Sequence, residues 1–218
     1  MLSQYKTVYS GGEAEIIEKK SRFIATVKPV KSEEEALAFI EELKKKYWNA
    51  THNCFAYVIG ERFQTQRCSD DGEPSGTAGR PMLDVLLGEE VHDVAVVVTR
   101  YFGGTLLGTG GLVRAYQGAT KAGLQASAVI TKMHGSKVAI QTDYTGLGKI
   151  QYILGQRGLA ILNSEYTDRV VLEVLLPEEA AKQVMAEITE GTNGQAVMEV
   201  LQECYFADVD GTMEIFTE

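Results

Sequence analysis

The chain is poor in cysteine and in long apolar runs, and these shortages exclude several classes of protein. Its three cysteines, Cys54, Cys68 and Cys204, are far apart and odd in number, so they indicate neither a disulfide framework nor a zinc cluster. No apolar run approaches the roughly 18 residues that a membrane helix requires, and the first residues lack the apolar core of a signal peptide. We therefore expect a cytoplasmic protein with no membrane association, no bound metal and no other cofactor.

Positive charge is also scarce, because 21 basic side chains stand against 30 acidic ones and the formal net charge is −9. Residues 1–130 carry 15 basic and 16 acidic side chains, whereas residues 131–218 carry 6 and 14. Asp and Glu are absent from residues 94–142, which still contain five Arg and Lys residues. Either this stretch forms an electropositive surface for an anionic partner, or a buried strand and a helix of small residues leave no room for carboxylates.

Hydrophobic periodicity predicts an α+β protein of two domains, residues 1–132 and residues 136–218. In the second domain the predicted order β-α-β-β-α-β is typical of a ferredoxin-like fold, a four-stranded antiparallel sheet with two helices on one face. The residues after Ala207 have no clear pattern and are predicted to form a loose tail. The elements predicted for the first domain are strands 15–18 and 23–30, a helix capped by Ser32, strand 53–59, helix 82–87, strand 91–100 and helix 112–126.

One candidate site is the acidic loop from Asp70 to Pro81. Asp70, Asp71 and Glu73 place three carboxylates within four residues, and hard divalent cations prefer oxygen ligands. The spacing is not that of a calcium loop, however. The interpretation that we favour is a surface loop whose acids cap the following short helix or pair with Arg80.

A second candidate is the glycine-rich segment from Arg100 to Arg114, which contains five glycines between a predicted buried strand and a predicted helix. Bare backbone N–H groups at the positive end of a helix attract anions, and the two arginines can close on such a site. The segment matches neither the phosphate loop nor the dinucleotide fingerprint, whose third glycine is replaced by Val113. The alternative is a tight turn that needs positive φ angles.

At these segments the sequence resembles the IMPACT family, in its bacterial YigZ-like branch. The resemblance implies an N-terminal domain with a ribosomal-protein-like α/β fold, akin to domain four of elongation factor G, and a ferredoxin-like C-terminal domain akin to domain five. Eukaryotic relatives regulate translation under amino-acid stress but carry a different second domain, and the resemblance implies no catalytic residue. The matching residues are Lys20–Ala25, His52–Tyr57, Asp70–Pro81, Val98–Gly104 and Gly110–Tyr116.

Our first hypothesis is a non-catalytic cytoplasmic protein that binds RNA, the ribosome or translation factors, and so regulates translation. Its arginines and Lys121 would contact phosphates, two tyrosines would stack on bases, and glycines would let the backbone approach closely. This hypothesis depends on the guanidinium groups facing outward rather than pairing with acids. The expected contact residues are Arg22, Arg80, Arg100, Tyr101, Gly103, Gly104, Gly110, Gly111, Arg114, Tyr116 and Lys121.

The second hypothesis is a small enzyme that acts on a phosphorylated or peptide-like substrate in a cleft formed by loops 70–81 and 102–111. His52 would be the general base, and Asp70, Asp71 and Glu73 would supply the acid or hold a metal. Cys54 is a weaker candidate, since a thiol in a predicted strand is usually buried and inert. A third possibility is an adaptor that binds a protein partner without nucleic acid.

Overall fold

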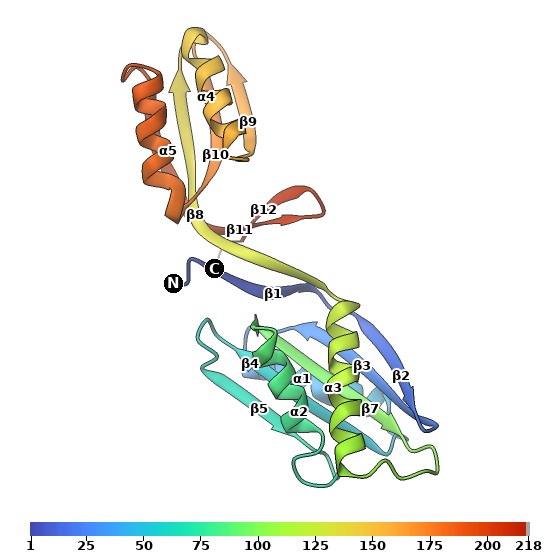
Figure 1. Ribbon diagram of the computed structural model, residues 1–218. Coiled ribbons are helices and arrows are strands. Elements are labelled where there is room, and N and C mark those ends of the chain that lie inside the picture. Colours follow the sequence, from blue (N-terminus) through green and yellow to red (C-terminus); the bar gives the residue numbers. More distant parts are fainter. Residues whose placement is uncertain (217–218) are drawn as a thin grey trace. The chain divides into compact units, whose positions relative to one another are not determined.

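The computed structural model describes residues 1–216, which form two compact units (Figure 1). The N-terminal unit comprises Tyr5–Ile130, and the C-terminal unit comprises the first four residues together with the chain from Thr131 onward. The division falls inside one long strand, β8 (Ala128–Thr142). Both units combine helices with a sheet, which confirms the predicted α+β class. Within residues 1–216 no helix is long and apolar enough to cross a membrane.

A five-stranded antiparallel sheet organises the N-terminal unit, in the order β2-β3-β7-β4-β5. A separate short strand, β1, pairs in parallel with β6. Strands β1 and β5 have no counterpart in the prediction, because their sequences are short and largely polar. The bounds are β1 (Gln4–Ser10), β2 (Glu13–Glu18), β3 (Ser21–Pro29), β4 (His52–Ile59), β5 (Thr65–Ser69), β6 (Val91–His92) and β7 (Val94–Tyr101).

Helices cover both faces of this sheet, which explains why residues 94–98 of β7 are all apolar. Val96 and Val98 pack in the core beneath α2 (Gly79–Gly88) and α3 (Thr109–Gln125). The alternating Ala95 and Val97 face the opposite core, which α1 covers. Both helices α2 and α3 begin three residues earlier than predicted, at the ends of the two loops singled out as candidate sites.

Helix α1 (Glu33–Lys46) begins at the predicted cap. The Ser32 hydroxyl accepts a hydrogen bond from the Glu35 backbone N–H at 3.2 Å. The Glu35 carboxylate reaches back to the backbone N–H of Lys31 at 2.8 Å, one residue before the position that the usual capping box occupies. Acidic residues in the first turn and three lysines in the last turn both complement the helix dipole.

The C-terminal unit has the predicted ferredoxin-like arrangement, with strand order β11-β8-β10-β9 and antiparallel pairing throughout. Helices α4 (Tyr144–Gln156) and α5 (Glu178–Gly191) pack on one face through an apolar core that includes Ile150 and Ile188. Gly158 has φ +64° just after α4, as expected of a glycine that ends a helix. The remaining bounds are β9 (Ile161–Tyr166), β10 (Val170–Pro177), β11 (Val197–Val209) and β12 (Thr212–Phe216).

The prediction of a loose tail after Ala207 is wrong. Strand β11 continues through Ala207, turns at Asp210 and Gly211, and pairs with β12. Met213 of β12 packs against a small core on the sheet face that contains Leu175 and Phe206. The strand is only five residues long, and part of its support comes from Leu175, which is distant in the chain.

Candidate binding site

A cavity of about 440 Å³ lies in the N-terminal unit where β4 begins and β7 ends. The strand register places His52 opposite Arg100, so both side chains reach this end of the sheet. Part of the acidic loop and the start of α3 complete the cavity, which therefore joins the two segments that the sequence singled out. Its lining residues are Thr51, His52, Gly72, Glu73, Pro74, Arg100, Phe102, Leu106, Leu107, Gly108, Thr109 and Leu112.

A buried ion pair forms the floor of the cavity. Nη1 of Arg100 lies 2.5 Å from Oε1 of Glu73, and the two side chains are only 6% and 3% exposed. The Arg100 guanidinium lies over the rings of Phe23 and Phe102, with its carbon 5.4 and 5.7 Å from their centres. Breaking such a pair leaves an uncompensated buried charge. The prediction that Arg100 acts as a free phosphate contact is therefore wrong, since its charge is already neutralised.

Two further buried side chains continue this network away from the cavity. The Tyr116 hydroxyl donates to Oε1 of Glu73 at 2.8 Å, and the Cys54 thiol lies 3.4 Å from the same hydroxyl. Burial is the main cause that raises the pKa of both the Cys54 thiol and the Tyr116 hydroxyl. Cys54 is thus an inert buried thiol, as its strand pattern predicted. Tyr116 is completely buried, so its predicted stacking on a base is wrong.

His52 has one ring nitrogen tied to the backbone and the other directed toward Glu73. Nδ1 lies 2.8 Å from the carbonyl oxygen of Asp71, and Nε2 lies 3.8 Å from Oε2 of Glu73. The side chain is 18% exposed and lines the cavity. His52 and Glu73, two members of the predicted enzyme site, therefore come together.

The other two carboxylates of that predicted site have structural roles. Asp70 accepts hydrogen bonds from the backbone N–H groups of Gly76, Ala78 and Gly79 at 2.8–3.0 Å, and so caps α2 from outside the helix. Burial raises the pKa of Asp70, but these three N–H groups outweigh it and hold the pKa below its ordinary value. Asp71 accepts from the backbone N–H of Asn53 at 2.7 Å. The capping interpretation of the acidic loop is confirmed, although Arg80 pairs with Asp84 instead of with this loop.

Metal binding has no visible support at the acidic loop. Across residues 1–216 no group of three or more His, Cys, Asp or Glu side chains is arranged to hold a metal ion.

The start of α3 is an uncapped helix end on the cavity wall. Its cap residue, Gly108, has φ +74°, and neither a capping side chain nor an acidic residue is present in the first turn. The first bond of the helix is donated by Leu112 to the Gly108 carbonyl. The N–H groups of Thr109, Gly110 and Gly111 therefore precede the intrahelical ladder, and no group among residues 1–216 accepts from them.

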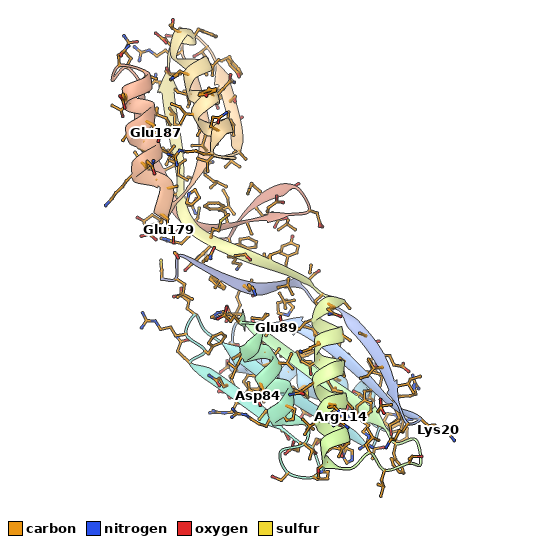
Figure 2. All side chains as sticks on the ribbon, in the orientation of Figure 1. Lys20, Asp84, Glu89, Arg114, Glu179 and Glu187 are labelled. Atoms are coloured by element: carbon orange, nitrogen blue, oxygen red, sulfur yellow. The ribbon has the colours of Figure 1, made fainter. Side chains whose placement is uncertain are left out.

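The glycines of this segment serve different purposes. Gly104 and Gly108 have positive φ angles, as a tight turn requires, whereas Gly110 and Gly111 belong to α3. A Cβ on Gly103 would lie 2.1 Å from the carbonyl carbon of Lys20, so only glycine allows the loop to approach the β2–β3 turn. This contact places the lysine turn beside the loop that leads into α3 (Figure 2).

Most of the arginines expected at an outward positive surface are paired with acids. Arg22 forms two hydrogen bonds to Glu15, at 2.8 and 2.9 Å, and Arg80 lies 2.8 Å from Asp84. Together with Arg100, three of the four arginines predicted to contact phosphates are thus neutralised. The prediction of a surface with four free guanidinium groups is wrong.

Arg114 differs from these three arginines. It is exposed on α3 and has no ion-pair partner among the described residues (Figure 2). Its Nη1 would lie 3.5 Å from a Cβ on Gly110, so the guanidinium folds back over the start of the helix. The predicted contact Lys121 is exposed farther along the same helix. Positive charge at this site is therefore concentrated at the beginning of α3.

Exposed aromatic rings at this end of the sheet were missed or undervalued in the sequence. Trp48, the only tryptophan of the chain, is 82% exposed, and Phe102 is 47% exposed. Tyr101 is partly exposed and donates to the side-chain oxygen of Asn49 at 3.0 Å. The backbone N–H of Phe102 donates to the hydroxyl of Thr51 at 3.2 Å, which joins the turn after α1 to the cavity rim. The signal available in the sequence was an aromatic pair directly after a run of three lysines.

Comparisons with known proteins match both units. Residues 19–124 match the Impact N-terminal domain, and residues 140–195 match a domain of unknown function, DUF1949. The IMPACT family member YvyE of Bacillus subtilis is 45% identical, over 90% of each chain. YigZ of Escherichia coli is 38% identical, over 85% of this chain and 92% of its own.

A solved structure described as that of a hypothetical protein is 35% identical, with a TM-score of 0.58. It covers 93% of this chain, and 99% of its own length is matched. The two family matches cover one unit each, and the two relatives and this structure cover both units. The chain therefore belongs to the IMPACT family, in the bacterial branch that includes YigZ.

Proposed function

We propose that the N-terminal unit binds single-stranded RNA of the translation apparatus, and that the protein acts in the cytoplasm without catalysis. The observation that carries this proposal is the uncapped start of α3, which borders at Gly108, Thr109 and Leu112 a cavity that is also lined by the exposed ring of Phe102. Single-stranded RNA is recognised by this combination of phosphate contacts and base stacking. Binding to RNA or to the ribosome would let the protein regulate translation by occupancy.

The phosphate is expected at the beginning of α3. Free N–H groups and the positive end of the helix dipole favour an anion there, and Arg114 adds a full positive charge. Glu73 is the one carboxylate among the lining residues described, and Arg100 compensates its charge. An entering phosphate therefore meets no unpaired negative charge on the cavity wall.

The bases are expected on the rim. Phe102 and Leu106, which is 82% exposed, present apolar surface beside the cavity, and Trp48 is exposed in the turn that precedes Thr51. Stacking on such rings contributes about 1–3 kcal/mol per base and tolerates any sequence. We therefore expect RNA binding with little preference for base identity. The C-terminal unit carries 6 basic and 14 acidic side chains in residues 131–218 and is expected to repel the strand.

A charge placed at the start of α3 tests this proposal. Thr109 is exposed at the first helical position, where an acidic residue stabilises a helix by about 0.3–1 kcal/mol. Thr109→Asp should therefore preserve the fold while its carboxylate occupies the anion site. We expect at least a tenfold loss of affinity for single-stranded RNA, measured by fluorescence anisotropy at fixed salt.

Thr109→Asn is the matched control, because it has the same shape without the charge. Its affinity should stay within about twofold of the parent protein, a difference of less than half a kcal/mol. Equal binding by the Asp and Asn variants would show that the phosphate does not lie at α3, and the proposal would fail.

A second candidate function, hydrolysis of a phosphorylated or peptide-like substrate, is favoured by one observation. His52 and Glu73 lie together at the cavity floor, where a general base would be placed. In that case a panel of phosphomonoesters and dipeptides should include a substrate whose turnover His52→Asn abolishes. The absence of turnover over the whole panel would leave RNA binding as the sole proposal.

A further inference from the structure

We infer that His52 distinguishes RNA from DNA by accepting a hydrogen bond from a ribose 2′-hydroxyl next to the phosphate at α3. This inference rests on the proposed function, because it concerns the same cavity and assigns the group that recognises the sugar. It is carried by the hydrogen-bonding directions of the atoms on the cavity floor.

The tautomer of His52 follows from its partner. A backbone carbonyl oxygen can only accept, so Nδ1 must carry the proton in its 2.8 Å contact with Asp71. In the neutral ring Nε2 then has a lone pair and no proton. Because His52 lines the cavity, this second nitrogen is an acceptor placed where a ligand can reach it.

A second hydrogen-bond acceptor lies beside Nε2 of His52. Oε2 of Glu73 lies 3.8 Å from Nε2, and no described residue donates a hydrogen bond to this oxygen. The other carboxylate oxygen, Oε1, already accepts from Arg100 and Tyr116. Two acceptors at this separation cannot bond to each other, but a donor such as an O–H group can lie against both. The floor of the cavity is therefore suited to a ligand that donates.

The cavity wall at the start of α3 carries hydrogen-bond donors rather than acceptors. At the start of α3 the N–H groups of Thr109, Gly110 and Gly111 donate and require an acceptor, for which an anionic phosphate is well suited. A ligand that satisfies floor and wall together carries an O–H donor close to a phosphate. RNA has this pair at every nucleotide, in the 2′-hydroxyl and the adjacent 3′-phosphate, and DNA lacks the hydroxyl.

Three oligonucleotides of one sequence test the inference against the full-length protein: RNA, DNA and 2′-O-methyl RNA. Methylation removes the donor while it keeps the ribose oxygen as an acceptor. We expect RNA to bind about tenfold more tightly than either analogue, which corresponds to about 1.4 kcal/mol. Equal binding of RNA and 2′-O-methyl RNA would overturn the inference and leave RNA binding itself intact. Failure of all three strands to bind would overturn the proposed function and this inference together.

His52→Asn provides the matched variant. The Asn side-chain amide can occupy the position of Nδ1 and donate to the Asp71 carbonyl, but it has no atom at the position of Nε2. The preference for RNA over 2′-O-methyl RNA should fall from about tenfold to about onefold. A preference that persists in this variant would contradict the role of His52.

His52→Gln guards against an effect on the fold. Gln places an amide near the position of Nε2, so part of the RNA preference should return, although the Asp71 contact is lost. Thermal melting of both variants shows whether the cavity survives. A loss of preference in the folded Gln variant equal to that in the Asn variant would count against recognition through Nε2.

Discussion

The two units stabilise their sheets in different ways. The C-terminal unit packs two helices on one face through an apolar core, and its Arg157–Glu187 pair stays at the surface with side chains 27% and 38% exposed. The N-terminal unit instead buries Arg100 with Glu73 and extends this polar network to Tyr116. Burying charges costs more than apolar packing, and a domain does not need it for stability. The buried pair of the N-terminal unit lines the cavity, whereas the surface pair of the C-terminal unit lines none of the cavities described.

The units also differ in charge. Residues 1–130 have 15 basic and 16 acidic side chains, and residues 131–218 have 6 and 14. A nearly balanced unit can gather positive charge at one end, as the free Arg114 at the start of α3 illustrates. We therefore place nucleic-acid contacts in the N-terminal unit alone, and four comparisons between the units test this view.

The largest expected effect is a difference in stability between variants of the buried ion pair and of the exposed ion pair. Glu73→Gln leaves Arg100 buried without a counter-charge and should lower the free energy of unfolding by about 3–5 kcal/mol. Glu187→Gln, at the exposed pair with Arg157, should leave it nearly unchanged. Urea denaturation followed by circular dichroism measures both. Similar losses in the two variants would mean that the buried ion pair contributes no more to stability than the exposed one.

The next effect concerns two aspartates that cap helices. The Asp70 carboxylate serves three backbone N–H groups, whereas Asp143 at the start of α4 serves only that of Gly146. Asp70→Asn should lower the free energy of unfolding by about 2 kcal/mol, since an amide accepts at one oxygen and turns its N–H₂ group toward a donor. Asp143→Asn should cost little, because Asn caps as well as Asp. Thermal unfolding at pH 7 compares them.

Acid titration of unfolding checks the same carboxylate. Because the folded pKa of Asp70 is held below its ordinary value, the stability that it contributes is fully present above the unfolded pKa, about 3.9. This stability is lost as the pH falls through the folded pKa. The parent protein should therefore lose stability below about pH 4 more steeply than Asp70→Asn. Parallel curves would contradict the role of the three N–H groups.

Exposed aromatic rings give a smaller effect, on binding rather than on stability. Trp48 in the N-terminal unit and Tyr152 on α4 are 82% and 61% exposed. Trp48→Ala should weaken binding of single-stranded RNA by about fivefold through lost stacking. Tyr152→Ala should have no effect, because its unit repels the strand. If Tyr152→Ala weakens binding as much as Trp48→Ala, the RNA contacts also involve the C-terminal unit.

The smallest effect is expected at two exposed cations. Arg114→Ala should weaken RNA binding about twofold at moderate salt and reduce the slope of log affinity against log salt by about 0.7, the value for one phosphate contact on a single strand. Lys182→Ala, on α5 of the C-terminal unit, should leave the slope unchanged. Affinities measured between low and moderate salt separate the two cases. An unchanged slope in Arg114→Ala would remove this arginine from the phosphate site.

Sequence patterns predicted the elements whose cause is local. Ser32 starts α1 and Gly158 ends α4, because caps and positive φ angles depend on a few neighbouring residues. The split β-α-β-β-α-β order was also visible, because alternation and helical periodicity recur there without interruption. Strand β12 was missed, since part of its support comes from Leu175, which is distant in the chain.

The candidate site was predicted in part. Both loops were recognised from their glycines and carboxylates, and they do border one cavity. The roles of individual residues were not visible, because Arg100 was expected to face a phosphate and is buried against Glu73. The pairing of Arg100 depends on Glu73, which lies 27 residues away in the sequence.

The sequence by itself determined the family, the two-unit α+β organisation and the glycine-rich start of α3, since these follow from short-range patterns and matching segments. Only the tertiary structure decided which carboxylate of the acidic loop caps α2, that Arg100 is neutralised by Glu73, and that His52 turns one nitrogen toward Glu73. The physical reason is that pairing and desolvation depend on distances across the sheet, which strand register sets and local sequence does not encode.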